Sequence, residues 1–144
     1  MMLLLSFLAC AAFAIPIYNF QNIQHFGEIQ VGGQELVVIF DTGSTHQWIT
    51  STECKSIVCK SNKRYSPQKS STIQPMSQKF EVWYGSGLIK GVMALEEVLI
   101  GDFKLKDFPI GLVYEEIGDS FREVIMYSAS ILWNHRTGNQ RRRK

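Results

Sequence analysis

Asp41 is the residue whose type and position point most directly to chemistry. It follows five apolar residues, Leu36 to Phe40, which predict a buried strand, and it precedes the turn-forming run Thr42-Gly43-Ser44. A carboxylate in such a place can act as a general base toward water. Asp and Ser also end strands by hydrogen-bonding to nearby backbone amides. The tripeptide by itself is therefore also consistent with a turn that has no catalytic role.

A second group of polar and aromatic residues lies further along the chain. Trp83-Tyr84-Gly85-Ser86-Gly87 separates two runs in which apolar and polar residues alternate, which predicts the flexible tip of a β-hairpin. A serine nucleophile is not indicated, because neither Ser44 nor Ser86 lies in Gly-x-Ser-x-Gly and no His–acid partnership is apparent.

The elements that must position these residues are those of an all-β protein between His25 and Val113. Apolar and polar residues alternate along several short runs, and turn residues separate the runs. The pattern predicts one strand that ends at Val31 and further strands over 36–40, from Trp48, over 79–83 and around 98–105. Turns are predicted at 32–33 and 101–102, and a polar surface loop is predicted over 60–77. No helix of convincing period and cap is predicted before residue 114.

Residues 1–14 are predicted to be a secretory signal peptide. The stretch is apolar, has no acidic residue and ends in Ala12-Phe13-Ala14, the small-x-small form of a cleavage site. A buried N-terminal strand is the alternative. The run is too short to span a bilayer, and no other segment predicts a membrane span. The predicted location is therefore secreted or endolysosomal.

Three cysteines limit the covalent and metal chemistry. Cleavage after Ala14 would remove Cys10 and leave Cys54 and Cys59, which predicts a disulfide across C-x4-C in an oxidising compartment. Zinc is disfavoured, because the histidines are scattered and this cysteine spacing is unusual for zinc. We therefore predict no metal and no cofactor.

The C-terminal residues differ in composition from the rest of the chain. The formal net charge is +2, but five of the 15 basic residues lie in 136–144, so the remainder holds ten basic against 13 acidic residues. Residues 124–133 are apolar with little period, which indicates a boundary, and 127–144 is predicted to be a disordered basic tail. Because a secretory signal contradicts a nuclear role for this tail, nucleic acid is not predicted as a partner.

Taken together, the motifs resemble the pepsin-like aspartic proteases, the family of pepsins and of cathepsins D and E, and specifically their N-terminal lobe. The resemblance runs from about Asn19 to Val113. Its markers are Phe26-Gly27, Val38-Ile39-Phe40-Asp41-Thr42-Gly43-Ser44, Trp48, the pair Cys54 and Cys59, Ser70-Ser71-Thr72, Tyr84-Gly85-Ser86-Gly87 and Gly91. It implies a pepsin-like acid protease fold, here a single partial N-terminal lobe over 15–126 with a flap hairpin.

The resemblance implies that Asp41 is one of two catalytic aspartates. The two would share a proton and hold the water that attacks a peptide carbonyl. Thr42 would bond across the interface between two lobes, and Gly43 would let the backbone approach the carboxylate. Ser44 would bond the outer oxygen of Asp41.

The resemblance also implies a mobile cover for the substrate. Tyr84, Gly85 and Ser86 would form a flap that closes over the bound peptide. The indole of Trp48 would hydrogen-bond the Tyr84 hydroxyl. Simple core packing is the alternative for this aromatic pair.

The implied chemistry needs two carboxylates. Two carboxylates about 3 Å apart cannot both ionise, so one acts as base toward water while the other, protonated, donates to the carbonyl oxygen. The sequence contains Asp-Thr-Gly once, and Asp102, Asp107 and Asp119 stand in other contexts. The family also leads us to expect Asp-Gly and a supporting strand after Met126, where this sequence reads Tyr-Ser-Ala-Ser-Ile-Leu-Trp.

The sequence therefore predicts a truncated half of an aspartic endopeptidase that acts on proteins or peptides. It would need a C-terminal lobe or a second chain to supply the second aspartate, and would be inactive alone. One alternative is a homodimeric protease of the retroviral type, although the cysteine pair and the missing strand argue against it. Another is a catalytically inactive, secreted peptide-binding relative, which the intact Asp-Thr-Gly and the lack of an Asn-x-Ser/Thr sequon disfavour.

Overall fold

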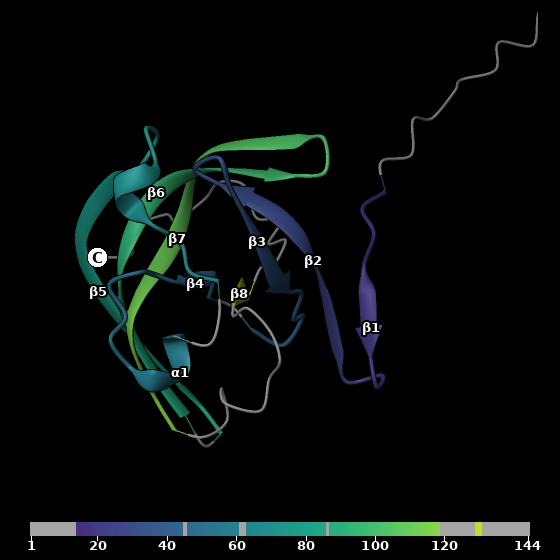
Figure 1. The fold of residues 1–144 in the computed structure, drawn as a ribbon, viewed down its shortest axis with the longest axis horizontal. Helices are drawn as coiled ribbons and strands as arrows, with labels where there is room; N and C mark the ends of the chain where they lie inside the picture. Colours follow the sequence, from purple (N-terminus) through teal and green to yellow (C-terminus); the bar gives the residue numbers. More distant parts are fainter. Residues whose placement is uncertain (1–13, 45, 61–62, 86, 119–128, 131–144) are drawn as a thin grey trace, which may run out of the picture.

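The computed structural model describes residues 14–44, 46–60, 63–85, 87–118 and the backbone of 129–130. Figure 1 shows strands that wrap around one interior, with β1 standing apart at one end. The predicted signal peptide before Ala14, Ser86 of the predicted flap, and the predicted tail other than 129–130 lie outside the described residues.

The described elements are mostly strands, which confirms the all-β prediction. They are β1 (Tyr18–Phe20), β2 (Gln24–Val31), β3 (Gln34–Ile39), β4 (Trp48–Thr50), β5 (Gln74–Tyr84), β6 (Gly87–Ile100), β7 (Phe103–Ile117) and β8 (Ala129–Ser130), with the short helices α1 (Ile57–Lys60) and η1 (Pro67–Lys69). One sheet holds the eight strands in the order β1-β2-β3-β8-β4-β7-β6-β5. A further pairing between β2 and β6 bends the sheet back on itself, so that its strands enclose the core.

The β2–β3 hairpin forms where the turn residues predict it. Gly32 and Gly33 connect the strands with φ of 53° and 73°, the left-handed values that a two-residue type I′ turn requires and that glycine adopts without strain. The strands stay paired as far as Phe26 and Ile39. The hairpin therefore delivers the chain to Asp41 at the end opposite its turn.

Three long antiparallel strands, β5, β6 and β7, form the other wall of the molecule (Figure 1). The β6–β7 turn falls at Gly101-Asp102 as predicted, and both strands extend well beyond the predicted 98–105. The predicted surface loop over 60–77 is wrong at two points, because β5 begins at Gln74 and Tyr65 is fully buried. The first six residues of β5 are all exposed, so the sequence there carries no alternation that would reveal a strand.

The core consists of two clusters of buried side chains. The larger one fills the space between the β2–β3 hairpin and the long strands, and its buried members are Ile29, Val31, Leu36, Val38, Ile49, Tyr65, Ala94, Val98, Ile110 and Leu112. The smaller one joins β4 to the β5–β6 hairpin and contains Trp48, Ile89 and Val113, with Phe80, Val82 and Tyr84 packed against it.

β8 occupies a position for which the sequence predicts no strand. Ser130 pairs in parallel with Ile39 of β3 and antiparallel with Trp48 of β4, so β8 lies between the strands on either side of Asp41. The expectation that this loop lacks a supporting strand is therefore wrong at Ala129–Ser130. Two residues are too few to give a periodic pattern, so the sequence could not reveal this pairing.

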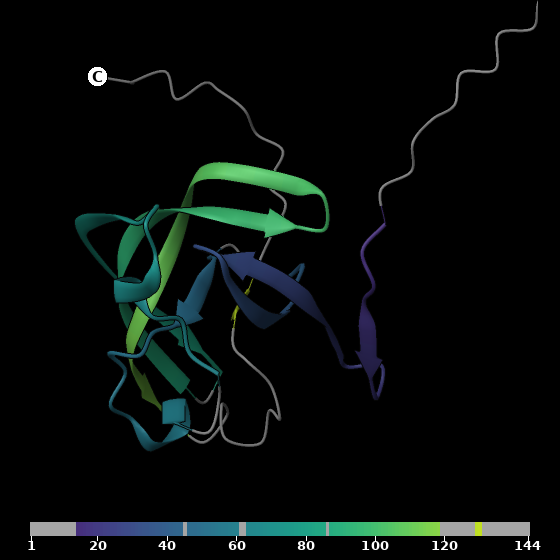
Figure 2. The same cartoon turned by 45° about the horizontal axis from the view of Figure 1, so that its top comes forward.

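β1 stands away from the body of the molecule in both views (Figure 1, Figure 2). It is held by antiparallel pairing with the first residues of β2, and the Tyr18 ring stacks on the Phe26 ring at a centroid distance of 5.5 Å. Within the described part of the chain, no helix is long and apolar enough to cross a bilayer.

Candidate active site

Asp41 lies at the surface, just beyond the end of β3. Its Oδ1 accepts a hydrogen bond from the Gly43 amide at 2.8 Å. A Cβ atom on residue 43 would lie 3.2 Å from the same oxygen, so glycine lets the amide close on the carboxylate. Oδ2 has no hydrogen-bond partner among the described residues. The arrangement orients Asp41 and leaves one oxygen free for a further group.

Tyr84, the last residue of β5, reaches the loop that carries Asp41. Its hydroxyl accepts a hydrogen bond from Nε1 of Trp48 at 3.0 Å and lies 3.3 Å from the hydroxyl oxygen of Ser44. Ser44 and Trp48 are both buried. The hydrogen bond expected between Trp48 and Tyr84 is therefore present, and it ties the tip of the β5–β6 hairpin to the loop of Asp41.

Ser44, Thr42 and Gly85 are described residues of the predicted site, but the structure gives none of them a hydrogen bond to the Asp41 carboxylate. The Ser44 hydroxyl lies within 3.4 Å of the backbone N and O of His46 and within hydrogen-bond distance of Tyr84, where the sequence predicts a bond to Asp41 instead. Thr42 is exposed. Gly85 enters the hairpin tip with φ of 36°, and Ser86, which follows it, lies outside the described residues.

Backbone hydrogen bonds fix both ends of the loop between β3 and β4. At its start, the amide of Phe40 donates to the carbonyl of His25 at 2.7 Å, and at its end the amide of Gly111 donates to the carbonyl of Gln47 at 2.8 Å. β8 pairs with the strands on both sides of the same loop. The position of Asp41 is therefore set by three neighbouring strands, which is how a fold holds a reacting group in place.

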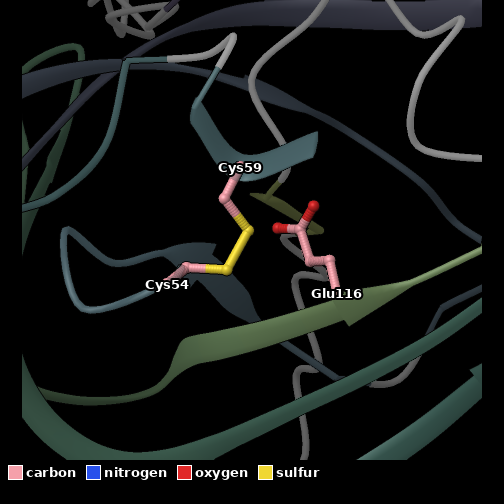
Figure 3. Close-up of side chains that lie close together, drawn as sticks. All are labelled: Cys54, Cys59 and Glu116. Atoms are coloured by element: carbon pink, nitrogen blue, oxygen red, sulfur yellow. A yellow bond between two sulfur atoms is a disulfide. The ribbon is translucent and has the colours of Figure 1, made fainter. Parts of the chain in front are cut away.

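The predicted disulfide between Cys54 and Cys59 is present, with the two Cα atoms 6.0 Å apart. Both cysteines are buried, and Figure 3 shows the carboxylate of Glu116 beside them. Oε1 of Glu116 accepts a hydrogen bond from the Thr50 hydroxyl at 2.6 Å. Burial raises the pKa of Glu116, although the bond from Thr50 opposes this shift.

A second buried carboxylate, Glu96, holds the segment between α1 and β5 against β6. Its Oε2 accepts hydrogen bonds from the hydroxyls of Tyr65 at 2.5 Å and Ser70 at 2.6 Å, while Oε1 accepts from the hydroxyl of Thr72 and from the Glu97 amide. Burial alone raises the pKa of Glu96, but these hydrogen bonds outweigh it and lower the pKa below its ordinary value. Burial, and next the bond to Glu96, raise the pKa of Tyr65.

Replacement of Trp48 by Phe tests the link between the hairpin and the loop of Asp41. Phe keeps an aromatic ring but removes the donor to Tyr84 and leaves some space, so we expect the free energy of unfolding to fall by about 1–2 kcal/mol. We also expect faster amide hydrogen exchange at the end of β5. Chemical denaturation and exchange mass spectrometry measure the two effects.

Trp83 provides the matched control for this change, because it neighbours Tyr84 and the residue is 74% exposed. Trp83→Phe should alter stability by less than about 0.5 kcal/mol, as is usual for surface positions. Equal losses in the two variants, with unchanged exchange at the hairpin, would contradict a specific role of the Trp48–Tyr84 bond.

Comparison with known proteins identifies the family to which this site belongs. The profile of the family described as eukaryotic aspartyl protease matches residues 24–126. The chain belongs to the eukaryotic aspartyl protease family. The matched region contains Asp41, the residues of the hairpin tip and the disulfide, and it ends before β8.

Individual aspartyl proteases are similar over the same part of the chain. Chymosin of Bos taurus is 36% identical over 110 residues, which cover 75% of this chain and 29% of that protein. Pepsin A of Rhinolophus ferrumequinum is 38% identical over 105 residues (72% and 27%), and cathepsin E-B of Xenopus laevis is 35% identical over 108 residues (74% and 27%). The chain therefore spans less than a third of the length of these aspartyl proteases.

Proposed function

We propose that this chain supplies one catalytic aspartate, Asp41, to an aspartic endopeptidase that hydrolyses proteins or peptides. The observation that carries the proposal is the exposed Asp41 carboxylate, which is oriented by the Gly43 amide and linked through its loop to Tyr84 of the hairpin. Membership of the aspartyl protease family supports the same role. Tyr84, Gly85 and Ser86 would cover the substrate as a flap.

Hydrolysis would require a second aspartate beside Asp41. Two adjacent carboxylates share a proton in acid, so one accepts a proton from the attacking water while the other donates to the peptide carbonyl oxygen. The sequence has Asp-Thr-Gly once. We therefore propose that a C-terminal lobe or a second chain provides the partner, that Thr42 contacts it, and that the 144-residue chain alone is inactive.

Reconstitution tests the need for the second aspartate. The recombinant chain is incubated with denatured haemoglobin between about pH 3 and 5, where a carboxylate pair holds one proton. A second sample also contains the separately produced C-terminal lobe of bovine chymosin. We expect cleavage in the mixture and none by the chain alone.

Other results would distinguish the alternatives. Cleavage by the chain alone as a monomer would contradict the need for a partner, and cleavage by a dimer would favour a homodimeric protease. An absence of cleavage in both samples, with a statine-type inhibitor bound by the monomer, would favour a peptide-binding protein. Sedimentation during the assay measures the oligomeric state.

We further propose that residues 1–14 direct the chain into the secretory pathway. The disulfide between Cys54 and Cys59 supports this location, because such bonds persist in oxidising compartments. Expression of the full chain in eukaryotic cells should release a product that begins at Ile15. N-terminal sequencing of the medium fraction, with retention of Met1 as the contrary result, tests the proposal.

A further inference from the structure

Glu116, Cys54 and Cys59 form a buried cluster that the proposed proteolysis does not use. One carboxylate oxygen and the two sulfur atoms lie within 4.8 Å of one another. The residues come from distant parts of the sequence, because β7 carries Glu116 while the cysteines flank the start of α1. All three are 4% exposed or less, and Figure 3 shows the carboxylate turned toward the sulfurs.

The hydrogen bonding of Glu116 is incomplete. Thr50 donates to Oε1, and the Glu116 amide donates to the Ser56 hydroxyl, but Oε2 is buried with no partner among the described residues. Leaving a buried polar atom unsatisfied costs about 1–3 kcal/mol. Such exceptions are few in folded proteins, and each calls for an explanation such as strain, a catalytic or redox role, a water molecule or a bound ion. The Glu116 side chain is therefore held as a metal ligand would be: the Thr50 hydrogen bond orients Oε1, and Oε2 has no hydrogen-bond partner among the described residues.

We propose that Cys54, Cys59 and Glu116 form a binding site for Zn²⁺ when the disulfide is reduced, although the cysteine spacing alone disfavours zinc, because the fold brings a carboxylate beside the two sulfurs. Two thiolates and one carboxylate are ligands that zinc accepts, and three protein ligands leave the fourth position of a tetrahedral site for water. The site does not exist in the oxidised chain, because the sulfurs are then bonded to each other. Metal binding would thus report the redox state of the disulfide, independently of Asp41.

The chemistry balances with a dithiol as reductant. Reduction breaks the Cys54–Cys59 bond and yields two thiols, while the two electrons and two protons come from the dithiol, which becomes a disulfide. Zn²⁺ then replaces the protons of the two thiols and any proton on Glu116, so two or three protons enter the solvent. The resulting site carries a net charge of −1, with Thr50 orienting the carboxylate from outside the metal shell.

Cobalt binding tests the proposal, because Co²⁺ occupies zinc sites and its thiolate and tetrahedral absorption bands identify the ligands. The full chain carrying Cys10→Ser is reduced with excess dithiothreitol, freed of it anaerobically and titrated with Co²⁺, and Zn²⁺ is then added. We expect thiolate-to-cobalt bands in the reduced protein, none in the oxidised protein, and displacement by Zn²⁺. Circular dichroism follows the fold throughout.

Glu115 offers a matched control for the carboxylate ligand. It precedes Glu116 on β7, but its side chain is 40% exposed and pairs with Lys90 at 3.2 Å. Glu116→Gln should weaken Zn²⁺ binding by at least about tenfold, the loss that even outer-shell changes cause, while Glu115→Gln should not. X-ray absorption of the zinc-loaded protein that retains Glu116 should show two sulfur ligands. This measurement does not depend on whether the Glu116→Gln variant folds.

Several results would overturn the proposal. Equal cobalt binding by the oxidised and reduced chains would show that the cysteines are not ligands. Equal zinc affinity of Glu116→Gln and Glu115→Gln would remove Glu116 from the site. A reduced chain that is unfolded and stays unfolded with Zn²⁺ would show that the folded cluster does not bind the metal.

Discussion

Replacement of Asp41 by Asn is expected to abolish peptide hydrolysis by the reconstituted two-lobe enzyme. An amide cannot take a proton from the attacking water or share one with a second carboxylate, so the acid–base pair is lost. We expect kcat/KM to fall by about 10⁴-fold or more, the scale seen when one catalytic group is removed from another class of protease. Initial rates on a peptide substrate, measured in acid with equal amounts of both lobes, give the ratio.

The structure predicts that this loss occurs without a loss of stability. The side-chain oxygen of Asn can still accept the Gly43 amide hydrogen bond, and position 41 is exposed, so the thermal midpoint should stay within a few degrees. Asp102→Asn is the matched control, because Asp102 is an exposed aspartate in the β6–β7 turn. If Asp41→Asn kept most of the activity, or if Asp102→Asn lost as much, Asp41 would not be the catalytic base.

The features that the sequence predicts well are those set by local chemistry. Gly32-Gly33 and Gly101-Asp102 define hairpin turns by themselves, and each forms where it was expected. The family resemblance predicts the link between Trp48 and Tyr84, and the structure contains it. The two turns need no knowledge of distant contacts, whereas this bond joins residues 36 positions apart and is predicted only from the family pattern.

The features that the sequence does not predict depend on which distant segments meet. Glu96 and Glu116 read as ordinary surface charges, since buried glutamates are rare. Ala94, Glu96 and Val98 nevertheless occupy alternate positions of β6 and are all buried, so alternation along this strand could have placed Glu96 inside. No such signal marks Glu116, because it neighbours the disulfide only once β7 is folded against α1.

Glu96→Gln is expected to produce a large loss of stability. Glu96 is fully buried and accepts hydrogen bonds from three hydroxyls and one amide. A neutral amide replaces half of this acceptor capacity with donors, which leaves buried hydroxyls poorly paired. We expect the free energy of unfolding at pH 7 to fall by about 3 kcal/mol. Urea denaturation followed by fluorescence measures the change.

The pH dependence of this loss separates the charge of Glu96 from its packing. The pKa of Glu96 is lower in the folded chain than its ordinary value, so its ionisation stabilises the fold above the unfolded pKa of about 4.3. That contribution disappears as the pH falls through the folded pKa. The difference between wild type and Glu96→Gln should therefore be constant at neutral pH and shrink in acid below about pH 4.

Glu97→Gln is the control for this titration, because Glu97 is the next residue of β6 but pairs with Lys104 at the surface at 2.8 Å. Such exposed ion pairs contribute about 0–1 kcal/mol, so this variant should lose little stability at any pH. A loss for Glu96→Gln that does not change with pH would show that packing, and not the buried charge, stabilises this region. Similar losses in the two variants would contradict the idea that hydrogen bonds to Glu96 anchor the segment from Tyr65 to Thr72. The Glu97 side chain pairs with Lys104 instead, so its replacement leaves those hydrogen bonds in place.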